Sequence, residues 1–129
     1  MAGEQVVWKY MNLSNYDRLT ITGNTLTKKL SAQWDGAAIS ANPVYNNGYV
    51  EFKAIEVNKN RMLGLSSAYT GSSYLNIDYA IYLQSNGTIG IYEVGINRGV
   101  YGTYAANDVF RVANDNNVIR YYKNGTIFY

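Results

Sequence analysis

The C-terminal segment, residues 108–129, constrains the fold of this chain more than any other stretch. Two runs that alternate apolar and polar residues, Asp108–Val112 and Val118–Lys123, flank a cluster of Asn and Asp. Asn124-Gly125 then leads into a third run, Thr126–Tyr129, on which the sequence ends. Alternation with a period of two is typical of half-buried β-strands, and Asn-Gly is typical of the tight turns that join them. The segment therefore predicts an antiparallel meander.

The same pattern extends through the rest of the chain. Tyr49–Val57 places Val50, Phe52 and Ala54 on one face of a strand, and Ile77–Gln84 also alternates. Further strands are predicted at Gln5–Met11, Arg18–Thr22, Thr25–Lys29, Ala37–Ser40, Arg61–Ser66 and Thr88–Val94. Runs at this spacing of about 8–12 residues, with no helical crossover between them, predict an all-β fold. We expect an antiparallel two-sheet β-sandwich, formed by residues 1–129 as a single domain.

Glycine and asparagine mark the expected turns. Asn86-Gly87 and Asn124-Gly125 predict type I′ turns, which need positive φ at both central residues, and Asn47-Gly48 is a third candidate. Asp115–Asn117 supplies oxygen atoms that suit either a hairpin turn or a calcium site, and its position between two strands favours the turn. Gly64 interrupts an apolar run, which predicts a bulge or a close approach of two backbones.

Composition excludes several classes of function. The chain has no Cys and no His, so disulfides, zinc sites and catalysis by Ser-His-Asp or Cys-His are excluded, and no cofactor is expected. Net charge is only +2 with 16% charged residues, which gives no case for nucleic acid as a partner. No apolar run of about 18 residues is present, so no membrane span is expected. The wealth of Tyr, Asn, Gly, Ser and Thr favours an extracellular or cell-surface module, with Met1–Gly3 as a start or cloning remnant.

An ordered set of residues resembles the concanavalin-A-like lectin/glucanase jelly roll, especially the SPRY-like modules of secreted bacterial surface proteins. The resemblance covers nearly the whole chain, and its sharpest part is the hairpin that ends in Tyr121–Gly125. The set consists of Val7-Trp8, Gly23–Lys28, Trp34, Gly36-Ala37, Gly48–Phe52, Gly64–Ser66, Asp78–Tyr82, Gly95, Asp108–Val112 and Tyr121–Gly125. The resemblance implies a jelly-roll sandwich that continues beyond this hairpin to a closing strand, which this chain lacks.

The apparent absence of a closing strand leads to one functional hypothesis. Either the chain has been shortened, or another chain or peptide supplies the strand. A sandwich without that strand exposes unpaired backbone groups, which a partner can fill by strand addition. Phe128 and Tyr129 would then lie at a protein contact, and a homo-oligomer or a strand-donating partner is expected.

Catalysis is not expected. Glucanases of the resembled fold carry two carboxylates two positions apart on one strand, and retaining hydrolysis needs them about 5 Å apart. In this chain Lys53 stands two places after Glu51, and Ala80 two places after Asp78. Glu93 stands alone. The chain is therefore predicted not to be an enzyme.

Sugar binding is the second functional hypothesis, with a glycan or another cell-surface ligand as partner. Aromatic rings that stack on a pyranose, together with Asn, Asp or Arg that bond its hydroxyls, make such sites. The segment Gly95–Tyr104 combines glycines, one cation and two aromatic side chains, and is predicted to be a recognition loop, although plain packing explains it equally well. The candidate ligand-binding residues are Trp34, Asp35, Tyr69, Tyr74, Arg98, Tyr101 and Tyr104. Because one fold hosts many functions, the two hypotheses stay open.

Overall fold

The computed structural model describes residues 8–10, 19–22, 25–28, 38–40, 47–67 and 77–129. The described residues with regular secondary structure are all in β-strands, so the expectation of an all-β fold is confirmed for this part of the chain. The chain divides into two compact units, one formed by residues 1–43 and 68–76 and the other by residues 44–67 and 77–129.

The first unit contains two small antiparallel pairs. Strand β1 (Trp8–Tyr10) pairs with β4 (Ala38–Ser40). Strand β2 (Leu19–Thr22) pairs with β3 (Thr25–Lys28). All four lie where strands were predicted from the sequence.

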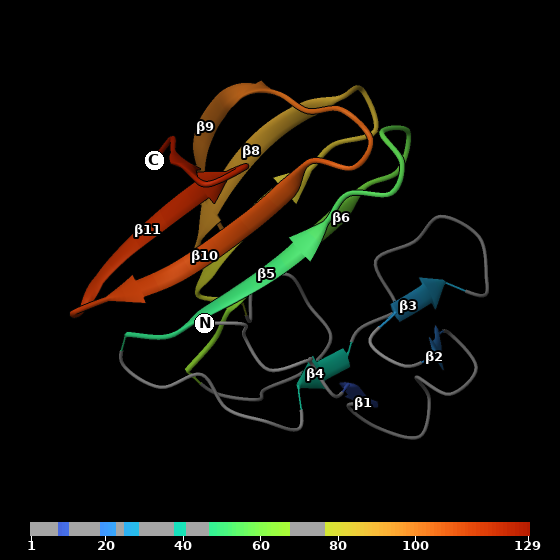
Figure 1. Ribbon diagram of the computed structural model, residues 1–129, viewed down its shortest axis with the longest axis horizontal. Helices are drawn as coiled ribbons and strands as arrows, with labels where there is room; N and C mark the ends of the chain where they lie inside the picture. Colours follow the sequence, from blue (N-terminus) through green and yellow to red (C-terminus); the bar gives the residue numbers. More distant parts are fainter. Residues whose placement is uncertain (1–7, 11–18, 23–24, 29–37, 41–46, 68–76) are drawn as a thin grey trace. The chain divides into compact units, whose positions relative to one another are not determined.

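The second unit is a β-sandwich of two four-stranded antiparallel sheets (Figure 1). One sheet has the order β12-β11-β10-β5 and the other the order β6-β7-β8-β9. Their bounds are β5 Tyr49–Lys53, β6 Arg61–Leu65, β7 Tyr79–Leu83, β8 Thr88–Glu93, β9 Ile96–Thr103, β10 Val109–Asp115, β11 Val118–Lys123 and β12 Thr126–Ile127. The predicted two-sheet antiparallel sandwich is thus confirmed for this unit.

The core lies between the two sheets and follows the alternation of the sequence. On β7, Ile81 and Leu83 are fully buried, and on β10 so are Phe110 and Val112. Burial of one such side chain contributes about 1.5–3 kcal/mol. The buried cluster consists of Ala54, Ile81, Leu83, Ile89, Ile91, Tyr104, Phe110, Val112 and Tyr121.

Two of the predicted turns are confirmed, and in each of them two successive residues have positive φ. Asn124 and Gly125 have φ of 50° and 82°, as a type I′ turn requires. Asn116 and Asn117 have φ of 53° and 67°, which confirms the hairpin turn predicted between β10 and β11.

The predicted type I′ turn at Asn86-Gly87 is wrong, because only Gly87 has positive φ. Gly87 N–H donates to the carbonyl of Gln84 at 3.0 Å, and Gln84 N–H donates to that of Thr88 at 3.0 Å. This is a three-residue loop in which Gly87 occupies the left-handed position after a tight turn. The candidate turn at Asn47-Gly48 also lacks a second residue with positive φ.

Gly64 marks a close approach of two backbones, as its place in the sequence predicted. It faces Ala80 across the β6–β7 pair. A Cβ atom at this position would collide with the carbonyl oxygen of Tyr79 and lie 2.8 Å from the Cα of Ala80. Only glycine fits here without moving β6 away from β7.

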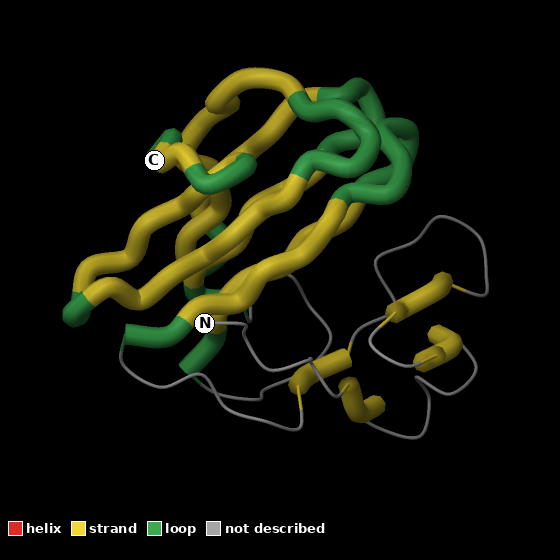
Figure 2. Tube along the Cα trace, in the orientation of Figure 1, coloured by secondary structure: helices red, strands yellow, loops and turns green. Residues whose placement is uncertain are grey.

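The main error of the sequence analysis concerns Gly95–Tyr104, which was predicted to be a recognition loop. Residues Ile96–Thr103 instead form β9, the edge strand of the second sheet (Figure 2). The strand was missed because two register irregularities interrupt its alternation. The segment pairs with β8 through its main chain, although its side chains do not follow the pattern of a strand.

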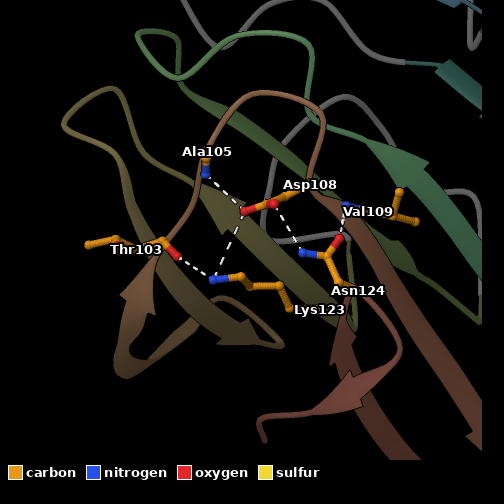
Figure 3. Close-up of polar contacts among 6 residues, drawn as sticks. All are labelled: Thr103, Ala105, Asp108, Val109, Lys123 and Asn124. Atoms are coloured by element: carbon orange, nitrogen blue, oxygen red, sulfur yellow. Dashed lines mark hydrogen bonds and ion pairs between the residues drawn. The ribbon is translucent and has the colours of Figure 1, made fainter.

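A polar network joins the start of β10 to the turn after β11 (Figure 3). Asp108 accepts hydrogen bonds from Ala105 N–H at 2.8 Å and from the Asn124 amide at 3.0 Å. The Asn124 side-chain oxygen accepts from Val109 N–H at 2.8 Å. These bonds, the Ala105 N–H first, lower the pKa of Asp108 because they favour its charged form.

Lys123 extends this network to the other sheet (Figure 3). Its Nζ donates to the carbonyl oxygen of Thr103, at the end of β9, at 2.9 Å. It also lies 4.0 Å from the Asp108 carboxylate. The hydrogen bond to Thr103 links the end of β9 to β11.

Candidate functional site

Five side chains gather at the edge of the sandwich where β8 and β9 approach β11 and the C-terminal residues. We call this group the Glu93 cluster. It consists of Glu93 from β8, Arg98 and Tyr101 from β9, Tyr121 from β11, and Tyr129. In Figures 1 and 2 the C-terminus lies beside β9 and β11.

Glu93 links the two sheets. One of its carboxylate oxygens accepts a hydrogen bond from the Tyr121 hydroxyl at 2.9 Å, and the other lies 3.3 Å from Arg98 Nε. The Glu93 side chain is 20% exposed and the Arg98 side chain 45% exposed, whereas Tyr121 is fully buried. A carboxylate so placed is held by a buried donor on one side and by a solvent-accessible cation on the other.

The rings of the cluster pack edge to face. Tyr129 lies 4.6 Å from Tyr101 and 5.4 Å from Tyr121, measured between ring centroids. The backbone supports this position, since Tyr121 N–H donates to the Tyr129 carbonyl at 3.3 Å and Phe128 N–H donates to the Tyr121 carbonyl at 2.9 Å. Tyr101 and Tyr129 nevertheless stay 36% and 39% exposed. The two residues predicted to lie at a protein contact, Phe128 and Tyr129, thus also contact their own domain.

Burial and Glu93 raise the pKa of two tyrosines in the cluster. Burial raises the pKa of Tyr121 far above its usual value, and its hydrogen bond to Glu93 raises it further. The pKa of Tyr129 is also raised, by partial burial and then by the Glu93 charge and by Tyr101. Tyr121 and Tyr129 therefore stay neutral to higher pH than a free phenol, beside one carboxylate and one guanidinium.

A β-bulge aims Arg98 at Glu93. On β8 the neighbours Ile91 and Tyr92 face Gly99 and Asn97 on β9. Arg98, which lies between the latter two, therefore has no residue opposite it on β8. Such an extra residue bends the strand and redirects a side chain. The Tyr101 hydroxyl donates to the Arg98 carbonyl at 2.7 Å, which holds the bulged backbone in place.

The ligand-binding residues predicted from the sequence lie in different surroundings in the structure. Arg98 and Tyr101 come together at the surface as part of the Glu93 cluster. Tyr104 is 7% exposed, packs 6.1 Å from Phe110 between ring centroids, and donates its hydroxyl to the Gln84 carbonyl at 2.9 Å. Its side chain is therefore part of the core. The other candidates, Trp34, Asp35, Tyr69 and Tyr74, lie outside the described residues.

Sequence reasoning missed Glu93 and Tyr121 as site residues. A usable signal exists for Glu93, because it continues the core-facing alternation of Ile89 and Ile91. A carboxylate in that register must find a partner or remain near solvent. Tyr121 carries no comparable signal, because tyrosine is common in strands.

A second group of charged and aromatic side chains covers the outer face of the other sheet. Glu51, Arg111, Tyr122 and Ile127 face one another in register across all four strands, and we call them the Arg111 row. Arg111 contacts Glu51 at 2.7 Å through Nη2 and at 3.1 Å through Nε. Its guanidinium also lies 3.9 Å from the ring centroid of Tyr49.

The Glu93 cluster presents polar groups and ring surfaces that a ligand could contact. It offers carboxylate oxygens as acceptors, guanidinium nitrogens as donors and two exposed ring surfaces. Its one carboxylate does not form the pair that glycoside hydrolysis uses.

A scan against protein-family models, a search of curated proteins and a search of solved structures found no significant match. Within the part of the chain that the structure describes, no helix is long and apolar enough to cross a membrane.

Proposed function

We propose that this chain is a non-catalytic binding module that recognises carbohydrate through the Glu93 cluster. One observation carries the proposal: Glu93, Arg98 and the exposed ring of Tyr101 are brought to one edge of the sandwich. Binding sites combine apolar or aromatic surface with a few polar groups in fixed positions. A pyranose presents a complementary surface, with C–H groups on its faces and hydroxyls around its rim.

The finer fold and the setting belong to the same proposal. Eight strands in two antiparallel sheets are compatible with a jelly roll of the concanavalin-A-like type, as the sequence resemblance implies. The module would serve a secreted or cell-surface protein in adhesion to glycans. Absence of catalysis is proposed because the cluster holds a single carboxylate.

A glycan array followed by calorimetric titration tests the proposal. The chain should bind at least one oligosaccharide at millimolar concentration or below. Arg98→Ala should weaken binding at least about tenfold, the effect of losing a bond to a charged group, and Tyr101→Ala should weaken it through loss of the stacked ring. Arg120→Ala is the matched control, because Arg120 pairs with Asp115 outside the cluster, at 3.5 Å. No binding to any glycan, or equal losses in all three variants, would refute carbohydrate recognition by this site.

A second candidate function is assembly by strand addition, which the edge strand β5 favours. Among the described strands β5 pairs only with β10. Ala54 N–H donates to the Asp108 carbonyl at 2.9 Å and Asn114 N–H donates to the Gly48 carbonyl at 2.9 Å, so even-numbered residues bond to β10. The amides of Tyr49, Glu51 and Lys53 therefore point the other way, where a further strand could pair.

Sedimentation velocity of wild type and Lys53→Pro tests assembly at β5. Proline at this position removes an amide that points away from β10, so the domain should stay folded. Assembly through β5 predicts an oligomer for wild type and a monomer for the variant. A wild-type monomer at all concentrations would argue against this function.

A further inference from the structure

Arg98 contacts Glu93 through only one of its three guanidinium nitrogens. Its Nε atom approaches Glu93, and its two terminal nitrogens have no partner among the described residues. A guanidinium carries five N–H donors in a planar fork, so most of them stay available. The side chain is 45% exposed, which leaves them accessible to a ligand.

Glu93 likewise keeps acceptor capacity. Each carboxylate oxygen has one partner among the described residues, Tyr121 for one and Arg98 for the other. A carboxylate offers about four lone-pair sites. The cluster therefore presents acceptors and donors side by side, beside the exposed rings of Tyr101 and Tyr129.

The charges of the cluster cancel. Glu93 and Arg98 form a pair of one negative and one positive charge, and Tyr121 and Tyr129, whose pKa values are raised, add no charge at neutral pH. An acidic ligand would gain attraction from Arg98 but suffer repulsion from the adjacent carboxylate. A neutral ligand with vicinal hydroxyls can donate to Glu93 and accept from Arg98 without this repulsion.

We infer that the Glu93 cluster selects neutral saccharides and discriminates against uronates and sialosides. This inference rests on the proposed carbohydrate function and names its ligand class. Glu93 acts as the selecting residue, because its carboxylate both accepts ligand hydroxyls and repels ligand carboxylates. The bulge at Arg98 and the buried Tyr121 hydroxyl fix the two charged groups before the ligand arrives.

Paired titrations test the inference. Tetrasaccharides of glucose, galactose and mannose are titrated beside the corresponding tetrasaccharides of glucuronate, galacturonate and mannuronate, and lactose beside sialyllactose. At least one neutral ligand should bind about tenfold or more tightly than its acidic counterpart, as expected for a charge-assisted hydrogen bond exchanged for a like-charge contact. Binding of the neutral ligand should not change with salt, because no net charge is neutralised.

Glu93→Gln sharpens the test because it leaves a positive site of nearly the same shape. It should weaken the neutral ligand about tenfold, since a hydrogen bond to a charged acceptor is replaced by one to an amide. It should also strengthen the uronate about tenfold and make uronate binding sensitive to salt. Arg120→Gln serves as the matched surface variant and should leave both affinities unchanged, and thermal melting shows whether each variant is folded.

The outcomes separate the two levels of the proposal. Tighter binding of uronates or sialosides by wild type would overturn the neutral selectivity and leave carbohydrate binding standing. An unchanged preference in folded Glu93→Gln would overturn the role of Glu93. No binding of any saccharide would overturn the proposed function itself, and the inference with it.

Discussion

The Glu93 cluster and the Arg111 row are built from the same residue types but in different surroundings. Each contains a Glu–Arg pair and tyrosine, and each draws on β11 through one of two successive residues, Tyr121 and Tyr122. Tyr121 faces the core and is fully buried, whereas Tyr122 faces outward. The Glu93 side chain is 20% exposed, about half as much as that of Glu51 at 42%.

This contrast teaches that burial, and not residue type, decides how much a polar contact of a glutamate contributes to stability. The pair in the Arg111 row is exposed, and such pairs contribute about 0–1 kcal/mol. Glu93 depends on a buried hydroxyl, and removing the donor leaves a partly buried acceptor unsatisfied. A glutamate thus makes an exposed surface contact on one sheet in the Arg111 row, whereas in the Glu93 cluster it links the two sheets.

Truncation of the two neighbouring tyrosines should give the largest difference. Tyr121→Ala should lower the free energy of unfolding by about 3–5 kcal/mol, because it empties a large volume in the core. Tyr122→Ala should cost less than about 1 kcal/mol, because it removes only surface contacts. Urea denaturation of both variants measures the difference. Equal losses would show that the two faces of β11 are not distinct.

Alkaline pH should produce the next largest effect. The folded-state pKa of Tyr121 is raised by burial and by the Glu93 hydrogen bond, above an unfolded value of about 10. Stability from the neutral phenol is therefore complete below about pH 10 and is lost as pH rises toward the folded pKa. Between about pH 9 and 11, the decline in melting temperature should be shallower in Tyr121→Phe than in wild type.

Tyr122→Phe is the control for this experiment. The pKa of Tyr122 is raised chiefly by its hydrogen bond to Asp115, and its ring lies on the exposed face. Its removal should change the alkaline decline much less than removal of the Tyr121 hydroxyl. A steeper or unchanged decline in Tyr121→Phe would contradict the assignment.

At neutral pH, loss of the Tyr121 hydroxyl should have a moderate effect. Tyr121→Phe should cost about 1–3 kcal/mol, because Glu93 loses its buried donor. Tyr122→Phe removes a bond of 2.7 Å to Asp115 on the accessible face, and water replaces it at a cost of about 0.5 kcal/mol. Chemical denaturation should rank the two variants in this order.

Relief of backbone strain beside Glu93 should stabilise the protein. Val94 has φ of 51°, a left-handed conformation that is unfavourable for a β-branched residue, and it is 62% exposed. Val94→Asn should raise the free energy of unfolding by about 1 kcal/mol, because Asn tolerates positive φ and no buried contact is lost. A loss of stability in thermal melting would show that the Val94 side chain makes a needed contact.

The smallest effect is expected in the Arg111 row. Glu51→Gln should change the free energy of unfolding by less than about 1 kcal/mol, and the change should shrink further in high salt. A double-mutant cycle with Arg111→Gln measures the pair directly. A coupling as large as that between Glu93 and Tyr121 would erase the distinction between the two regions.

The candidate site was predictable only in part, for a reason visible in β9. Arg98 and Tyr101 stood out in the sequence as exposed polar and aromatic residues, but their segment was predicted to be a loop. A bulge inserts one residue and shifts the alternation, so the period-two signal disappears although the strand pairs with β8. Glu93 could be assigned to the inner face of β8, but nothing local places it beside Tyr121, 28 positions along the chain.

The sequence by itself determined the all-β class, most of the strands, the faces of β5, β7 and β10, and the type I′ turn at Asn124-Gly125. These features depend on side-chain periodicity and on the φ preferences of single residues, which act over a few positions. Only the tertiary structure decided that Ile96–Thr103 is an edge strand, that Tyr104 packs in the core, and that Glu93, Arg98 and three tyrosines meet. These features depend on contacts between strands distant in the chain, whose energies no local pattern contains.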